Sequence, residues 1–317
     1  MSNSACQAER VKGGILGVAL GDAFGALYEG GLLERALWGL IGKTGGKRRW
    51  TDDTQMTLDV LESLLEREGI DQEDLARRFA SSYKWSRGYG PGAARTLRRI
   101  RRGQPWESAA RSVYAGGSYG NGGAMRSLPI GLFFAKSGMG AVARAAEAAA
   151  AVTHAHALGR EGAVQVSLAT MLTFQGLDKH QLLLRLAERT ESKAFSQKLD
   201  AATRWLQSHK DVSAREVAST LGAGIAAVDS CITAIYVALR FSRSTFRCLI
   251  DFTVEMGGDV DTIAAMAGGI WGVARGIQDL PQEMLDQLED YGRLLRTAAD
   301  FAEAVEAREG QQADGAD

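Results

Sequence analysis

The sequence predicts an all-α protein, and three observations carry that prediction. Only 4 of the 317 residues are proline. Ala, Leu, Arg and Glu, which are good helix formers, dominate the long segments. Apolar residues recur at helical spacing, as in Leu58, Leu61, Leu64 and Leu65, whereas no stretch alternates over the length of a strand. We therefore expect about a dozen helices joined by Gly-rich loops.

These helices are expected to form one domain over residues 9–307. No Pro-rich, Ser-rich or single-charge stretch divides the chain, and 45% of the residues are apolar, which is enough for a sizeable core. The two ends, residues 1–8 and 308–317, are small and polar. They are predicted to be disordered tails.

The composition also excludes several classes of protein. The net charge of −1 gives no global field for nucleic acid or an acidic membrane surface. The 3 cysteines are scattered, which is typical of a reducing cytosol. The first residues do not form a signal peptide, and no apolar run is long enough to span a bilayer. The sequence thus predicts a cytoplasmic protein that binds neither DNA nor membrane.

Two sets of glycines recur at intervals of four residues: Gly13, Gly17, Gly21 and Gly25 near the N-terminus, and Gly268, Gly272 and Gly276 near the C-terminus. Residues at this spacing lie along one face of a helix. Glycine inside a helix costs about 1 kcal/mol relative to alanine, so each set needs an offsetting gain. We expect the two glycine-lined helices to cross with their backbones in close contact, which would join the two ends of the chain.

Acidic residues adjoin both of these segments and open a third. They are Asp22 and Glu29, then Asp52 and Asp53, which precede an amphipathic helix from about Gln55 to Glu66, and finally Asp259 and Asp261. One interpretation is that the second and third pairs are helix N-caps. A cap needs only one oxygen, however, and each pair offers two carboxylates beside threonine hydroxyls. Such oxygens are also the ligands that Mg²⁺ prefers, so both interpretations stay open.

Two Gly-rich segments are the other candidates for chemistry. The run from Gly116 to Arg126 presents backbone N–H groups before an apolar segment, as phosphate-binding loops do. It fits neither a Walker motif nor a Rossmann fingerprint, and a plain turn is the alternative. The shorter run Arg87–Gly92 has the same two interpretations. His154 follows an Ala-rich helix that begins near Gly140, and it is either a packed or C-terminal helix residue or a catalyst.

Six motifs follow one another along nearly the whole chain: Leu20–Ala23 with Glu29, Thr51–Thr54, Arg87–Gly90, Ser118–Arg126, Val152–Ala155 and Gly257–Ala264. In this order they resemble the motifs of the ADP-ribosylglycohydrolase family. That family includes the dinitrogenase-reductase-activating glycohydrolases and the vertebrate ADP-ribosyl-acceptor hydrolases. Each motif alone is weak, but six in register are highly specific.

The resemblance implies an orthogonal bundle of helices with a site for two Mg²⁺ ions at the floor of a cleft. The metal ligands would be Thr51, Asp52, Asp53, Asp259, Asp261 and Thr262. Glu29 and Asp53 would be catalytic, with Glu29 as the general acid and base. The substrate would be held by Gly90, Gly92, Tyr114, Gly117, Ser118, Tyr119, Gly120, Asn121 and His154. The family's adenine-stacking aromatic falls on Val113 here, so Tyr114 or Tyr119 would make that contact.

The motif forms around Tyr89 and Tyr119 are most similar to the branch that hydrolyses poly(ADP-ribose) and serine-linked ADP-ribose. This implies release of ADP-ribose from serine adducts, from the polymer or from O-acetyl-ADP-ribose. Two alternatives stay open, namely hydrolysis of arginine-linked ADP-ribose and a purely structural role. The segment between Glu29 and Thr51, which includes Trp38, would form a flap that influences the leaving group. We expect a monomer, because a compact metal site needs no partner subunit.

Overall fold

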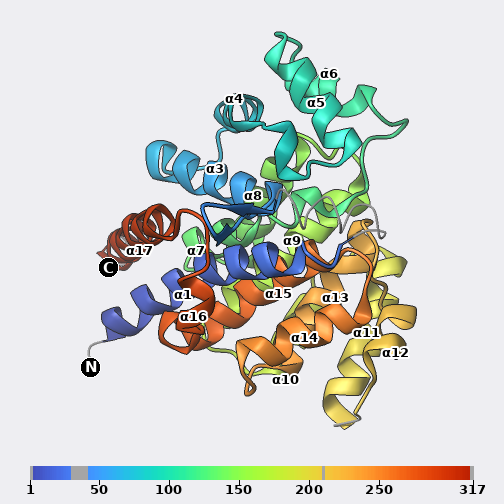
Figure 1. Cartoon of the computed structure of the whole chain (residues 1–317), viewed down its shortest axis with the longest axis vertical. Helices are drawn as coiled ribbons and strands as arrows, with labels where there is room; N and C mark the ends of the chain where they lie inside the picture. Colours follow the sequence, from blue (N-terminus) through green and yellow to red (C-terminus); the bar gives the residue numbers. More distant parts are fainter. Residues whose placement is uncertain (1–2, 30–41, 209–210, 315–317) are drawn as a thin grey trace.

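The computed structural model describes residues 3–29, 42–208 and 211–314 and confirms the all-α class (Figure 1). Sixteen α-helices lie in these residues, somewhat more than the predicted dozen because several are short. The strands seen there are β1 (Lys43–Thr44) and β2 (Lys47–Arg48), which pair as a small antiparallel hairpin. No described helix is both long and apolar enough to cross a membrane.

The first half of the chain forms α1 (Asn3–Gly25), α3 (Asp52–Arg67), α4 (Gln72–Ser82), η1 (Trp85–Arg87), α5 (Pro91–Arg101), α6 (Trp106–Ser112), η2 (Asn121–Gly123), α7 (Leu128–Phe133) and α8 (Met139–Ala151). The second half forms α9 (Ala157–Phe174), α10 (Lys179–Ala187), α11 (Lys193–Ser208), α12 (Ala214–Thr220), α13 (Ala227–Arg240), α14 (Phe246–Met256), α15 (Val260–Arg275), η3 (Ile277–Asp279), α16 (Gln282–Leu285) and α17 (Tyr291–Asp314).

The terminal helices reach further than the expected domain boundaries at residues 9 and 307. Helix α1 begins at Asn3, and α17 continues to Asp314. Residues 3–8 and 308–314 thus belong to these two helices. Both segments contain Ala and Gln, which extend a helix that has already been nucleated. Residues 1–2 and 315–317 lie outside the described part.

The two glycine-lined helices cross in the middle of the molecule, as predicted (Figure 1). A Cβ atom on Gly17 would lie 2.2 Å from the carbonyl oxygen of Gly268, and one on Gly21 would lie 2.1 Å from that of Ala264. A Cβ atom on Gly13 would lie 2.5 Å from the carbonyl oxygen of Gly272. In these pairs the residue number increases along α1 while it decreases along α15, so the two helices are antiparallel. The C-terminal end of α1 therefore lies beside the N-terminal end of α15.

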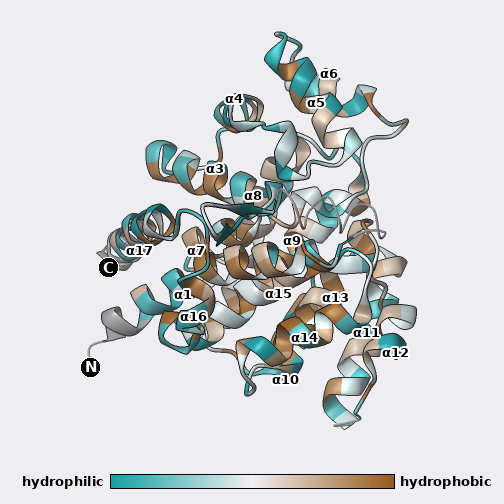
Figure 2. Cartoon of the chain, viewed as in Figure 1, coloured by the Kyte–Doolittle hydropathy of each residue, from teal (hydrophilic) through white to brown (hydrophobic). Residues whose placement is uncertain are grey.

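The core surrounds this crossing. Residues of α15 from Val260 to Val273 are all buried, as is nearly all of α9. Helices with apolar residues on every side belong in the interior. Figure 2 shows this distribution, with brown and white along α9, α13 and α15 and more teal on peripheral helices such as α6 and α17. The ends of α1 and α15 are thereby held on a rigid centre.

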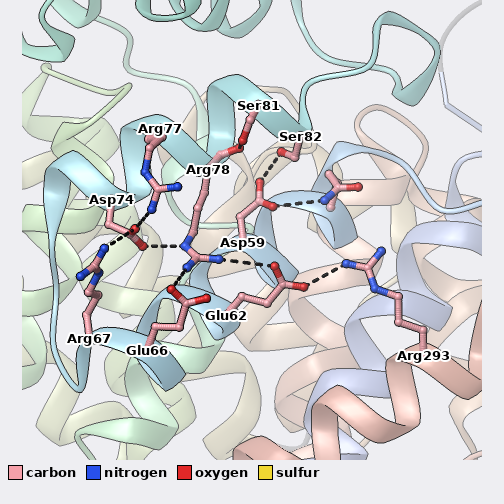
Figure 3. A network of polar contacts seen from close by, with 11 residues as sticks. Asp59, Glu62, Glu66, Arg67, Asp74, Arg77, Arg78, Ser81, Ser82 and Arg293 are labelled. Carbon is pink, nitrogen blue, oxygen red and sulfur yellow. Dashed lines mark hydrogen bonds and ion pairs between the residues drawn. The ribbon is translucent and has the colours of Figure 1, made fainter.

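A network of charged side chains fixes α3 to α4 and α17 (Figure 3). The Asp74 carboxylate is buried and accepts hydrogen bonds from three arginines, Arg67, Arg77 and Arg78. Arg78 also pairs with Glu66 at 2.5 Å. Although burial opposes it, these hydrogen bonds hold the pKa of Asp74 far below its usual range. The network thus stabilises the charged form of Asp74 and connects α3 to α4.

Asp59, in the same region of α3, behaves in the opposite way. Its buried carboxylate accepts hydrogen bonds from Ser82 Oγ at 2.6 Å and Gln55 Nε2 at 3.2 Å. Burial nevertheless raises the pKa of Asp59 from 3.8 to about 6. The folded state therefore favours the protonated form, and this contribution to stability is present at low pH and lost as the pH rises through about 6.

We expect Asp59→Asn to become more stable relative to the wild type as the pH rises. Between about pH 4 and about pH 8 the difference in unfolding free energy should shift in favour of the variant by roughly 2–3 kcal/mol. Urea unfolding of both proteins at the two pH values measures this. Asp251→Asn, at an exposed position of α14, is the matched control and should show no such shift. Parallel pH profiles for Asp59→Asn and wild type would contradict the assignment.

Candidate active site

Three helix ends meet at one point and bring together acidic residues that are far apart in the sequence. Asp22, near the end of α1, is completely buried and accepts hydrogen bonds from the backbone N–H groups of Thr51 and Thr54 at 2.9 and 3.0 Å. The Thr54 hydroxyl donates to the same carboxylate at 2.5 Å. Asp22 therefore ties the N-terminus of α3 to α1, and the antiparallel crossing adds the N-terminus of α15.

Two groups of carboxylates result, and they share one residue. Oxygens of Asp22, Asp53 and Asp261 lie within 4.8 Å of one another, as do oxygens of Glu29, Asp259 and Asp261. Glu29 is half-buried and the other four are buried. Asp53 also accepts a hydrogen bond from Thr262 Oγ1 at 3.2 Å. Asp22, Glu29, Asp53, Asp259 and Asp261, which are far apart in the sequence, thus form one acidic centre.

Capping does not account for the acidic pairs. Thr51 is the N-cap of α3, and its Oγ1 accepts from the N–H of Asp53 at 3.3 Å. The carboxylates of Asp52 and Asp53 are therefore not needed for that cap. Asp259 occupies the N-cap position of α15, but its side chain makes no capping hydrogen bond. Its Oδ2 instead accepts from Asn121 Nδ2 at 2.5 Å.

The burial and mutual repulsion of these carboxylates favour the binding of a cation. Burial raises the pKa of Asp53 well above its usual range, and repulsion from Asp22 and Asp52 adds to the effect. Burial and repulsion from Glu29 and Asp53 do the same for Asp261. None of the ion pairs formed in the described part of the chain involves these aspartates. Crowded carboxylates with hydroxyl neighbours and no basic partner fit a divalent metal that prefers oxygen ligands. The acidic residues can therefore hold a metal ion.

The Gly-rich loop is fixed against this centre by Asn121. In addition to its bond to Asp259, the Asn121 side chain donates to Ser230 Oγ at 3.1 Å, and its backbone N–H donates to Ile225 at 2.9 Å. Gly258 makes the approach of the 222–226 loop possible. Its φ is +78°, and a Cβ atom there would lie 1.9 Å from the carbonyl oxygen of Ala223.

A single cavity connects the acidic centre to the Gly-rich loops. Of the residues expected at the site, its wall contains Glu29, Asp52, Gly90, Gly92, Tyr114, Ser118, Gly120, Asn121, His154, Asp259, Asp261 and Thr262. Tyr114 packs directly on Gly92, where an added Cβ would lie 2.5 Å from the ring. The motifs that the sequence places far apart therefore surround one space.

Four expected residues lie next to this cavity without forming its wall. Thr51 and Asp53 are buried in the contacts described above. Gly117 packs against the 155–156 backbone, where a Cβ would lie 2.7 Å from the His156 nitrogen. The exposed ring of Tyr119 lies edge-on to His156, with 5.9 Å between the centroids. Of the two tyrosines expected near adenine, Tyr114 is thus the one in the wall.

Sequence reasoning did not assign site roles to Asp22, Arg126 or Ile225. Asp22 belongs to the first motif, and its place one turn from a helix end was a signal for it. Arg126 closes the Gly-rich motif, and it lines the cavity as a buried cation. Ile225 gives no signal in the sequence, since it reaches the cavity only through the pairing of its loop with residue 121.

The expected flap is only partly within the described residues. Residues 30–41, including Trp38, lie outside them. Residues 43–48 form the β1–β2 hairpin, and the backbone of Arg48 pairs with residues 287 and 289. Arg87, at the end of η1, stacks on Trp50 at 3.6 Å and pairs with Glu289 at 2.5 Å. These contacts hold the residues that precede Thr51.

Comparison with known proteins identifies the chain. The sequence model of the ADP-ribosylglycohydrolase family matches residues 3–312. ADP-ribosylhydrolase ARH3 of Mus musculus is 34% identical and aligns over 89% of this chain and 88% of its own length. ADP-ribosyl-[dinitrogen reductase] glycohydrolase of Rhodospirillum rubrum is 30% identical, over 89% and 90% of the two chains. A solved structure titled "ADP-ribosylglycohydrolase-related protein complex" has the same fold, with a TM-score of 0.70 at 24% identity, and covers 94% of this chain and 99% of its own.

By these comparisons the chain is a glycosyl hydrolase. More specifically, the chain belongs to the ADP-ribosylglycohydrolase family.

Proposed function

We propose that this protein releases ADP-ribose, in a Mg²⁺-dependent reaction, from O-linked adducts such as ADP-ribosylated serine, from poly(ADP-ribose) or from O-acetyl-ADP-ribose. The proposal rests on two clusters of three carboxylates. Both clusters contain Asp261, and they lie beside a cavity lined by glycine-rich backbone. Two groups of hard oxygen ligands suit two Mg²⁺ ions. The similarity to ADP-ribosylhydrolase ARH3 supports the choice of O-linked substrates.

The ligands of the two ions would be Asp53, Asp259 and Asp261 from these groups, together with Thr51, Asp52 and Thr262. Bound Mg²⁺ would supply positive charge that binds the hydroxyls of the distal ribose and fixes its anomeric carbon. In the Gly-rich loop, the backbone N–H groups of Ser118 and Tyr119 would donate to the diphosphate. Gly90 and Gly92 line the cavity, and Tyr114 offers an aromatic face for adenine.

Glu29 is the residue best placed to move protons. It lies in the cavity wall and is only half-buried, whereas the aspartates near it are buried. Cleavage of a glycosidic bond passes through a positively charged, oxocarbenium-like state, which the neighbouring carboxylates, including Asp53, would stabilise. Glu29 would take a proton from the attacking water and pass it to the leaving oxygen, whose bond to the anomeric carbon breaks. The water oxygen then forms the new bond to the anomeric carbon.

The proposal is tested by measuring free ADP-ribose released from a serine-ADP-ribosylated peptide, with Mg²⁺ and with excess EDTA. Release that requires Mg²⁺ is the expected result. An arginine-ADP-ribosylated peptide forms the second arm of the assay. Release from that peptide alone would replace the O-linked assignment by an arginine-specific one. If neither peptide releases ADP-ribose with Mg²⁺ present, the proposal is overturned.

We expect Glu29→Gln to reduce turnover far more than binding. The amide keeps the size of the side chain but cannot accept a proton from water, so kcat should fall by about 10²- to 10⁴-fold. The Kd for ADP-ribose, measured by calorimetry in Mg²⁺, should change by less than about threefold. Equal losses in kcat and in affinity would instead assign Glu29 to metal binding. Glu255→Gln, on α14, serves as the control for a glutamate outside the cavity.

A further inference from the structure

A chain of polar contacts lies behind the Gly-rich loop and ends at His154. The Arg126 side chain is buried and lies over the ring of Phe79 at 4.5 Å. Its Nη1 donates to the carbonyl oxygen of Gly122 at 2.6 Å, and its Nη2 donates to Thr153 Oγ1 at 2.7 Å. Thr153 Oγ1 in turn lies 2.7 Å from His154 Nδ1. Arg126 makes no ion pair with a carboxylate among the described residues. Its guanidinium is instead held by the Gly122 carbonyl oxygen and the Thr153 hydroxyl.

The direction of each hydrogen bond follows from what the groups can do. A guanidinium only donates, so the Thr153 oxygen accepts from Arg126. The Thr153 hydroxyl has one hydrogen of its own, and His154 Nδ1 is the acceptor that the described residues offer it. Nδ1 must then carry a lone pair, which places the imidazole proton on Nε2. The opposite tautomer would aim two donors at Thr153 and leave a buried hydroxyl hydrogen without an acceptor, which is unfavourable.

His154 Nε2 faces the turn from Gly120 to Gly122, and neither of these two glycines has a side chain. A Cβ atom would lie 3.6 Å from Nε2 at Gly120 and 3.1 Å from it at Gly122. The structure gives Nε2 no hydrogen-bond partner within the described chain, and His154 is part of the cavity wall. The N–H group therefore points into space that the two glycines keep open.

We propose that Arg126 and Thr153 are positioning residues that fix His154 as an Nε2–H donor to an oxygen of ADP-ribose. The class of acceptor is a ribose hydroxyl or a diphosphate oxygen, and this part of the inference rests on the proposed function. Burial and the charge of Arg126 also lower the pKa of His154 to about 3. The imidazole is therefore neutral at physiological pH, and the hydrogen bond needs no change of protonation.

The tautomer can be measured directly by ¹⁵N NMR of the imidazole nitrogens in histidine-labelled protein. The chain has 4 histidines, and His154→Asn assigns the signals of interest. The expected wild-type result is a protonated Nε2 and an unprotonated Nδ1, unchanged between about pH 6 and about pH 8. Thr153→Val keeps the shape but removes the hydroxyl, so the two tautomers should mix. The affinity for ADP-ribose, measured by calorimetry, should then fall by about tenfold. Thr153→Ser should restore both properties.

Three outcomes decide the matter separately from hydrolysis. A protonated Nδ1 in the wild type overturns the proposed chain of hydrogen bonds from Arg126 through Thr153 to His154, which we call the relay. So does a Thr153→Val protein that keeps the wild-type tautomer and affinity. If the wild type has the expected tautomer but does not bind ADP-ribose, the proposed function fails while the assignment of the hydrogen bonds is supported. Should Thr153→Val fail to fold, the wild-type tautomer and Thr153→Ser still test the relay.

Discussion

Asp261→Asn should reduce both Mg²⁺ affinity and hydrolysis by at least about 10²-fold. Asp261 belongs to both carboxylate groups, so its replacement weakens two candidate ion sites at once. The amide keeps the volume and one oxygen but removes the negative charge, and it aims N–H donors at neighbours that are themselves carboxylates. Because Asp261 lies in the first turn of α15, which is buried and well packed, the fold should survive the change.

The measurement is a titration of Mg²⁺ by calorimetry, followed by ADP-ribose release at saturating Mg²⁺. Asp251→Asn is the matched control, since it changes the same group on an exposed position of the preceding helix. We also expect Asp261→Asn to be at least as stable as the wild type without Mg²⁺, because the change removes a carboxyl group whose pKa is raised by burial and by repulsion from Glu29 and Asp53. Unchanged Mg²⁺ affinity would remove Asp261 from the metal centre.

The acidic centre shows how far the sequence could predict the site. Each acidic pair is visible as a motif, and the glycine stripes predict that the first and last of them are brought together. The sequence cannot decide between a cap and a ligand, because both place Asp or Thr before an apolar run. Only the observed capping by Thr51, and the absence of capping by Asp259, separates the two.

Other parts of the site depend on contacts that no local pattern encodes. Asp22 holds α3 through backbone N–H groups, and any carboxylate placed there by the fold would serve equally well. Ile225 enters the cavity wall through loop pairing across more than a hundred residues. Tyr114 and Tyr119 are equivalent candidates in sequence, and they differ only because Tyr119 is turned towards His156. Sequence periodicity describes single elements, whereas these features arise from the packing between elements.

The glycine crossing leads to the second large prediction. We expect Gly17→Ala to lower the free energy of unfolding by about 3 kcal/mol or more, although alanine is the better helix former. The added methyl would lie 2.2 Å from the carbonyl oxygen of Gly268, and this oxygen belongs to a backbone that cannot move aside alone. The two helices must separate, which also loosens the packing around the crossing. Urea unfolding in the absence of Mg²⁺ measures the loss.

Gly140→Ala in α8 is the control for this change, because the nearest atom to its Cβ is the flexible end of Arg144 at 3.5 Å. It should raise stability slightly, by less than about 1 kcal/mol. The acidic residues lie at one end of the same crossing, so folded Gly17→Ala should also bind Mg²⁺ more weakly than wild type. If Gly17→Ala were as stable as Gly140→Ala, the backbones of α1 and α15 would not be in contact. The close approach of these helices would then not be what brings Asp22 and Asp261 together.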